Sequence, residues 1–123
     1  MTSEQANAFC AALPASLHVV QWGGADVWKV GNADRAKVYA ICRMEGDHFT
    51  ASFKVSDMGF EVLRDHPDCR PAPYLASRGM KWIQYYRGDE MRGDDLLGLL
   101  AASHDIVAAG LPKKTRAALG LPI

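Results

Sequence analysis

A strict alternation of apolar and polar side chains runs through HFTASFKV, residues 48 to 55, and limits the folds open to the chain. One side of this repeat carries Phe49, Ala51, Phe53 and Val55, and the other carries Thr50, Ser52 and Lys54. The period of two predicts an antiparallel strand with one face on a core and the other in water. Residues 37 to 44 are rich in strand-forming side chains, and Glu-Gly-Asp at 45 to 47 predicts the hairpin turn between the two strands.

Further strands are predicted on both sides of this hairpin. Residues 17 to 21 and 26 to 30 are short strand candidates around a Gly-Gly turn. Residues 80 to 87 predict a strong strand. Pro71 and Pro73 make the segment before it extended but unsuitable for the centre of a sheet, because proline cannot donate to the ladder.

Helical patterns lie mainly toward the two ends of the chain. Residues 3 to 13 carry apolar side chains at spacings of three and four, behind an N-cap at Ser3 or alternatively Thr2. Ser56 predicts the cap of a helix that ends near Asp65. Residues 94 to 109 predict a longer helix with acids in its first turn, where the helix dipole favours them, and a short last helix is predicted from Pro112 to Gly120.

These elements together predict an α+β fold. The 123 residues have the length of one domain, and about half of them are apolar, which is enough for one core. The strands cluster in hairpins and the helices lie toward the ends. We therefore expect a single domain over residues 1 to 123, an antiparallel sheet with helices packed mainly on one face.

The charge of the chain is balanced overall but unevenly distributed. There are 14 basic and 14 acidic residues, whereas a dedicated nucleic-acid-binding domain is usually basic. Residues 70 to 88 nevertheless contain four basic side chains and no acid before Asp89, and residues 113 to 116 contain three more. A local basic face on a neutral body is therefore expected.

The strand predicted at 80 to 87 has two faces that carry different chemistry. Lys81, Ile83, Tyr85 and Arg87 alternate with Met80, Trp82, Gln84 and Tyr86. If the second set packs on the helices, the first set faces outward, where basic groups contact phosphate and a tyrosine ring stacks on a base. The alternative is that Lys81 and Arg87 only keep an exposed sheet face soluble.

Most catalytic and metal-binding patterns are missing from the sequence. His66 and Cys69 have a ligand-like spacing, but no second pair follows, which favours a turn. No nucleophile elbow or phosphate-binding loop occurs, and His104, Cys10 and Cys42 fall on predicted core positions. We therefore expect no enzymatic activity, no metal and no cofactor.

Nothing in the sequence predicts export or membrane insertion. The three cysteines are an odd number without close spacing, which fits a reducing cytosol. The first residues lack the pattern of a signal peptide, and no apolar run approaches the roughly 20 residues of a membrane helix. The expected location is the cytoplasm.

A colinear set of short motifs resembles the MmcQ/YjbR family. The motifs are Leu13-Pro14, Trp22-Gly23, Val27 to Gly31, Arg70 to Leu75, Arg78-Gly79, Lys81-Trp82, Ser103, and Leu111 to Lys114. The resemblance implies a small α+β domain, similar to the CyaY-like group, that is described as a double-wing DNA-binding module. It carries over no catalytic residues. The family's usual tyrosine after the helix serine is His104 here, so a role for that phenol is not implied.

Two functional hypotheses follow from these patterns. In the first, the chain is a non-enzymatic DNA-binding protein that contacts mainly the backbone, with the site residues Arg78, Lys81, Tyr85, Arg87, Lys113, Lys114 and Arg116 and a weaker contribution from Arg70. In the second, it binds a protein or a small ligand in a groove lined by Trp22, Trp28, Tyr74 and Trp82. One contiguous basic patch favours the first hypothesis, and a concave aromatic pocket favours the second.

Overall fold

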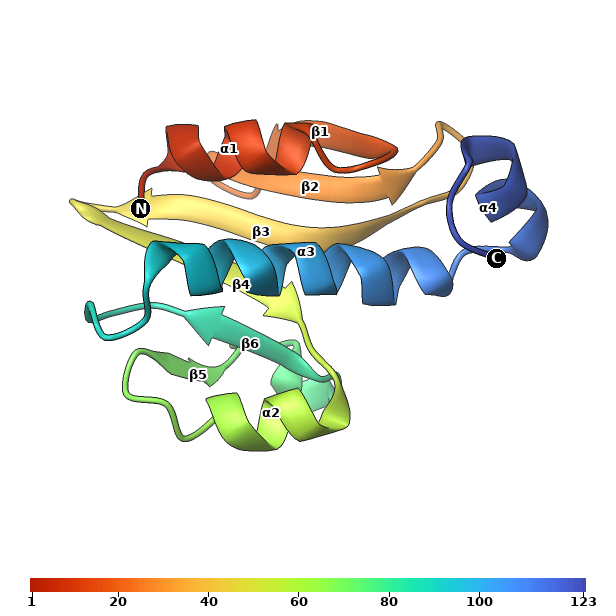
Figure 1. Cartoon of the computed structure of the whole chain (residues 1–123). Helices are drawn as coiled ribbons and strands as arrows, with labels where there is room; N and C mark the ends of the chain where they lie inside the picture. The colour runs from red at the N-terminus through yellow and green to blue at the C-terminus, as the bar shows by residue number, and fades with distance from the viewer.

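The computed structural model describes all residues from Met1 to Ile123 and contains one six-stranded antiparallel sheet. The strands follow the spatial order β1-β2-β3-β4-β6-β5 (Figure 1). Their bounds are β1 Ser16–Gln21, β2 Ala25–Gly31, β3 Ala36–Glu45, β4 His48–Lys54, β5 Cys69–Pro71 and β6 Trp82–Tyr85. The proline-containing β5 is the edge strand, as expected for a residue that cannot donate to a ladder.

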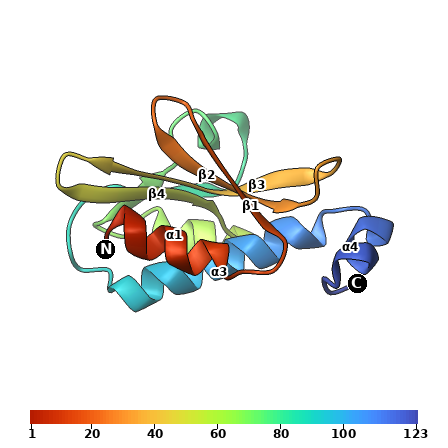
Figure 2. The ribbon, with the colours of Figure 1, turned by 90° about the horizontal axis from the view of Figure 1, so that it is seen from above.

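All four α-helices lie on or beside one face of this sheet. They are α1 Ser3–Ala11, α2 Asp57–Leu63, α3 Gly93–Ala109 and α4 Lys113–Leu119, and a short 3₁₀ helix η1 covers Ala76–Arg78. Helices α1 and α3 cross the face side by side, and Figure 2 shows both on the same side of the strands. No helix combines the length and the apolar composition that a membrane crossing demands. The predicted α+β class, with helices on one face, is confirmed.

The core lies between the sheet and these helices. Ala40, Phe53 and Ile83 are directly opposite one another on β3, β4 and β6, and all three are fully buried. Leu96 and Leu100 of α3 are buried in the same cluster. Burial of each large aliphatic or aromatic side chain contributes about 1.5–3 kcal/mol, so this layer holds the two halves of the fold together.

The predicted helix starts are present with one shift. Thr2, rather than Ser3, caps α1: its hydroxyl accepts from Gln5 N–H, and the Gln5 side chain accepts from Thr2 N–H. The Ser56 hydroxyl accepts from Gly59 N–H at the start of α2, as predicted.

The opposite face of the sheet is not simply exposed to water. The β1–β2 turn and the segment around η1 rise from it (Figure 2), and the Arg43 side chain on this face donates to the Trp22 and Gly23 carbonyls. Thr50 and Ser52 on β4 are buried. The prediction that the Thr50 and Ser52 face of β4 is exposed to water is therefore wrong. Strand β4 is central in the sheet, and the β1–β2 turn lies over the same face of the sheet.

Candidate functional site

Basic side chains gather at one end of the sheet. Strand β3 begins there, β4 ends there, β6 begins there, and α3 gives way to α4 (Figure 1). Three neighbouring hollows connect the region: one includes Lys81 and Met80, the next includes Met80, Lys54 and Lys37, and the third includes Lys37 and Pro112. We call this region the basic end and define it by Arg35, Lys37, Lys54, Arg78, Lys81, Lys113 and Lys114.

The cations of the basic end have no carboxylate partners. The ion pairs of the protein involve Arg43, Arg64 and two histidines, and none involves a residue of the basic end. Asp34 and Asp57 lie in the same part of the fold, but neither is within 4.0 Å of a basic group. The positive charge there is therefore available to an anionic partner.

Four predicted site residues lie within the basic end. Arg78 is exposed at the end of η1, and Lys113 and Lys114 are exposed in the first turn of α4. The Lys81 ammonium lies 4.8 Å from the centroid of the Phe60 ring, which holds it by a cation–π contact. The structure thus brings the loop before β6 and the last helix to one end of the molecule.

The structure corrects the predicted orientation of β6. Ile83 and Tyr85 face the helices and are 0% and 7% exposed, so the set predicted to face outward is the inner one. The Tyr85 hydroxyl donates to the Gly88 carbonyl at 3.1 Å, and its ring stacks on His48. Tyr85 is therefore a core residue with a satisfied hydroxyl and has no free ring face for a base.

The remaining predicted arginines lie elsewhere. Arg87 follows the far end of β6, about 20 Å along the chain from Lys81 at some 3.3 Å per extended residue. Arg70 and Arg87 place their guanidinium carbons 4.1 and 5.0 Å from the Tyr86 ring centroid, so these two form a separate cluster. Arg116 donates to the Leu111 and Pro122 carbonyls and ties the C-terminal segment to α4.

Strands β3 and β4 separate at the basic end. Their pairing stops at Ala40 and Phe53, so the first four residues of β3 have no partner on β4. Tyr39 is the extra residue of a β-bulge opposite β2. The Ser103 hydroxyl of α3 fills the first missing rung: it accepts from Lys54 N–H at 2.9 Å and donates to the Tyr39 carbonyl at 2.6 Å. We call this arrangement the fork.

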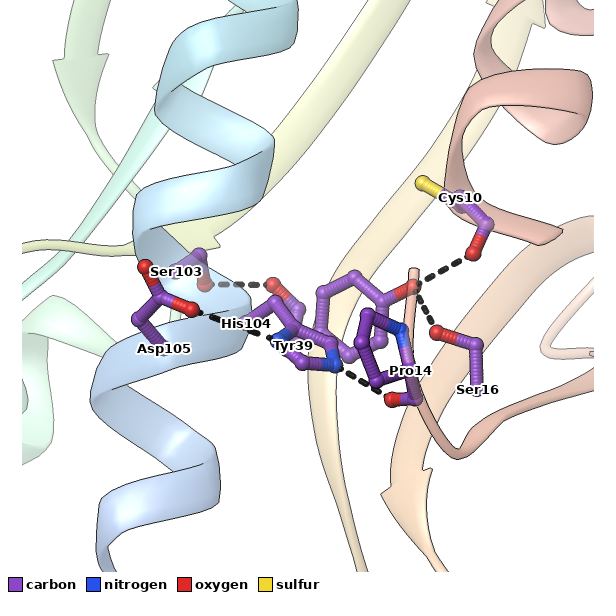
Figure 3. A network of polar contacts seen from close by, with 7 residues as sticks. All are labelled: Cys10, Pro14, Ser16, Tyr39, Ser103, His104 and Asp105. Carbon is purple, nitrogen blue, oxygen red and sulfur yellow. Dashed lines mark hydrogen bonds and ion pairs between the residues drawn. The ribbon is translucent and has the colours of Figure 1, made fainter. Parts of the chain in front are cut away.

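A buried polar network supports the fork from the helix side (Figure 3). The Tyr39 hydroxyl donates to the Cys10 carbonyl at 3.3 Å and pairs with the Ser16 hydroxyl at 2.8 Å. His104 is 3% exposed, and its Nε2 lies 2.6 Å from the Pro14 carbonyl, so Nε2 carries the proton that is donated. His104 is thus a satisfied core histidine, as predicted.

A cleft opens beside the fork, with a volume of about 470 Å³. The start of β3, which has no partner on β4, contributes Lys37 and Val38, and the end of α3 contributes Ile106 and Val107. Trp22 from the β1–β2 turn and Trp82 of β6 form further parts of the wall. Two of the four aromatic residues proposed for a groove therefore line one, whereas Trp28 is buried against α1 and Tyr74 is 84% exposed.

The three cysteines are buried free thiols, and His66 lies in a turn. Burial raises the pKa of the Cys10 and Cys69 thiols to about 11 and raises that of Cys42 further. Neutral, buried thiols are poor nucleophiles. The His66 ring accepts from Asp68 N–H within a turn, which is the interpretation that the lack of a second ligand pair favoured. No group of three or more His, Cys, Asp or Glu side chains is placed to hold a metal ion.

Comparisons with known proteins identify the family. The model of the YjbR family matches residues 11–106. The chain belongs to the YjbR family. A crystal structure of the Deinococcus radiodurans protein DR2400, described as a DUF419 domain, is 29% identical and superimposes with a TM-score of 0.86, covering 98% of this chain and 89% of that one. None of the curated proteins matches the sequence.

A second structure extends the YjbR comparison at the level of the fold. A Pseudomonas syringae protein solved by the Northeast Structural Genomics Consortium is 18% identical and superimposes with a TM-score of 0.66. The match covers 87% of this chain and 99% of that one. At this identity the similarity establishes a shared fold alone.

Sequence reasoning missed four residues of the basic end and the fork, namely Arg35, Lys37, Lys54 and Ser103. Arg35 has no predicted role, Lys37 is only the first residue of a predicted strand, Lys54 is only a polar position of the next one, and Ser103 is only part of a family motif. They meet because β3 and β4 diverge where the helix crosses them, which no local pattern reveals. The one available signal was the unusual serine on the apolar face of a long helix.

Proposed function

We propose that this YjbR protein binds nucleic acid, DNA in the first instance, without catalysing a reaction on it. The observation that supports the proposal is the basic end, where seven cations from four separate segments lie together without carboxylate partners. Lysine and arginine groups of this kind contact phosphate oxygens and release counterions, which supplies most sequence-independent affinity. DNA is the partner that the family resemblance implies, and the cytoplasm is the expected location.

The binding is expected to be weak and directed by charge. Acidic side chains gather at the opposite end of the molecule, at the β3–β4 turn, after β6 and in the first turn of α3 (Figure 1): Glu45, Asp47, Asp89, Glu90, Asp94 and Asp95. These repel phosphate, so only one end of the protein approaches the duplex. With about four phosphate contacts, affinity falls about 150-fold between 50 and 200 mM salt.

Charge reversal at α4 tests the proposal. Replacing Lys113→Glu together with Lys114→Glu removes two exposed cations, and acids in the first helical turn favour the dipole, so the helix is not weakened. We expect at least a tenfold loss of affinity for a short DNA duplex at 50 mM salt. The slope of log affinity against log salt should also become shallower by about two.

A matched control reverses two cations at the other end. Arg87→Glu together with Arg92→Glu changes the net charge by the same amount but lies away from the basic end. Fluorescence anisotropy with labelled duplex measures both variants. If the two double variants lose affinity equally, or if the wild type does not bind at 20 mM salt, the basic end is not a nucleic-acid interface.

A further inference from the structure

We propose that the cleft beside the fork is a binding site for a small amphipathic carboxylate, a molecule with an apolar body and one negatively charged head. This is a second activity, separate from nucleic-acid binding. It rests on three observations about the cleft: its apolar wall, its unpaired positive charge and a buried donor without a partner.

The wall of the cleft is suited to an apolar body. Most of its residues are hydrophobic, and they come from β3, β6 and the end of α3, together with the β1–β2 turn and the loop before β6. The volume of about 470 Å³ is in the range of small-molecule sites and is far larger than packing defects in a core. Water in such a space makes few hydrogen bonds, so an apolar group that displaces it gains free energy.

The charge of the cleft selects the head group. Lys37 and Lys54 are the charged residues of the wall, and no acid lies among the wall residues. Lys37 Nζ donates to the Gly110 carbonyl at 3.2 Å, whereas the Lys54 ammonium has no hydrogen-bond or ion-pair partner. Two cations without an acid beside them favour an anionic head group, and Lys54, whose ammonium has no hydrogen-bond partner, is the one free to donate to it.

Trp82 provides an independent indication of a ligand acceptor. Its side chain belongs to the cleft wall and is 5% exposed, yet its Nε1–H is buried with no hydrogen-bond partner. Buried indole N–H groups usually find an acceptor, and one that does not is costly. Trp82 lies directly opposite Lys54 in the sheet register, so an acceptor that reaches the indole also lies near the lysine.

Trp22 completes the site from the β1–β2 turn. Its backbone lies in the left-handed region at φ 54°, which is unfavourable for a bulky side chain, and the ring is 58% exposed on the cleft. Arg43 holds this turn through the Trp22 and Gly23 carbonyls. The turn, held by Arg43 in spite of this strain, places an aromatic ring over the cleft, where it would contact the apolar body of the ligand.

The donor set distinguishes a carboxylate from more polar ligands. The cleft offers the Lys54 ammonium group, the buried indole N–H of Trp82 lies unpaired within its wall, and the Gly110 carbonyl already accepts from Lys37. A nucleotide base or a sugar needs acceptors as well as donors to satisfy its edges. A single anionic head on an apolar chain or ring leaves none of its polar atoms unpaired in this site.

Calorimetric titration with octanoate and its uncharged counterpart 1-octanol tests the site. The wild type should bind octanoate at least tenfold more tightly than 1-octanol, with a change in tryptophan fluorescence. Lys54→Met keeps the length of the side chain and should lower octanoate affinity about tenfold while leaving 1-octanol unchanged. Trp82→Phe keeps most of the ring and should lower octanoate affinity severalfold.

The control and the contrary results are defined by the same titrations. Lys81→Met removes a cation that lies outside the cleft and should leave octanoate affinity within twofold. Thermal unfolding of each variant, followed by circular dichroism, confirms that it is folded. The proposal is overturned if octanoate does not bind at millimolar concentration, if it binds no better than 1-octanol, or if Lys54→Met and Lys81→Met reduce its affinity equally. Loss of DNA binding in the α4 variant with octanoate binding intact would separate the two activities.

Discussion

Replacing Ser103→Ala removes the hydroxyl that joins the two strands at the fork. The change deletes one oxygen atom from a fully buried position and leaves the Lys54 N–H and the Tyr39 carbonyl without their partner. A buried polar group left unsatisfied costs about 1–3 kcal/mol. Alanine is the better helix former by about 0.5 kcal/mol, which offsets a small part of the loss. We expect the free energy of unfolding to fall by about 2–4 kcal/mol.

Urea denaturation followed by circular dichroism at 222 nm measures this difference. A loss of that size lowers the thermal midpoint by roughly 8–16 °C in a domain of this length. Ser77→Ala is the control, because its hydroxyl donates to the Tyr74 carbonyl at an exposed position and its loss should cost less than 1 kcal/mol. If Ser103→Ala changes stability by no more than the control does, the Ser103 bridge between Lys54 and Tyr39 does not stabilise the fork.

Two further predictions concern the backbone and the thiols. Gly88→Ala should destabilise the protein by about 3 kcal/mol or more, because Gly88 has φ +78° and a Cβ there meets the buried Asp68 carboxylate. The control is Gly46→Ala, where φ is +62° and no atom lies near the added Cβ. It should lower the free energy of unfolding by only about 1 kcal/mol in the same urea assay. A cost for Gly88→Ala as small as that for Gly46→Ala contradicts this packing argument. Burial raises the pKa of Cys10 and Cys69 from 9.0 to about 11, so the native state holds these protons longer than the unfolded chain does. The contribution of these two protonated thiols to the free energy of unfolding is complete below pH 9 and is lost as the pH rises toward 11, at up to about 1.4 kcal/mol per pH unit for each thiol. A urea midpoint that does not change between pH 8 and 10.5 would refute this prediction.

The elements of this fold could be predicted because their signals are local. The alternation at 48 to 55, the Ser56 cap and the prolines around 71 each depend on neighbouring residues, and the structure has a strand, a helix start and an edge strand at those positions. The family motifs extended this agreement over most of the chain. Local chemistry was sufficient for the class of fold.

The faces of β6 could not be predicted in the same way. Both faces carry aromatic side chains, so polarity does not show which one meets the helices, and a strand assigned the wrong face exchanges every residue. Ile83 and Tyr85 pair with Phe53 and Ala51 on the core side of β4, and this pairing across some 30 residues decides the question. The Tyr85 prediction failed for that reason.

Only part of the basic end could be predicted from the sequence, for a related reason. Arg78, Lys81, Lys113 and Lys114 stand in two short clusters that composition reveals. Lys37 and Lys54 are single charges within strands, and each is ordinary until the divergence of β3 and β4 places both on one cleft. The long-range geometry of the sheet, rather than any residue pattern, joins the two clusters.

The separation of charge along the sheet also affects how the protein behaves toward itself. With a formal net charge of zero, the molecule does not repel its copies at neutral pH, yet its ends carry opposite signs. At low ionic strength such a body is an electric dipole, and neighbours attract end to end over a Debye length of about 30 Å at 0.01 M salt. At low salt and at a pH near its pI of about 6.9, the protein should therefore bind to both cation-exchange and anion-exchange columns. Sedimentation should show self-association of the protein that 0.15 M salt abolishes.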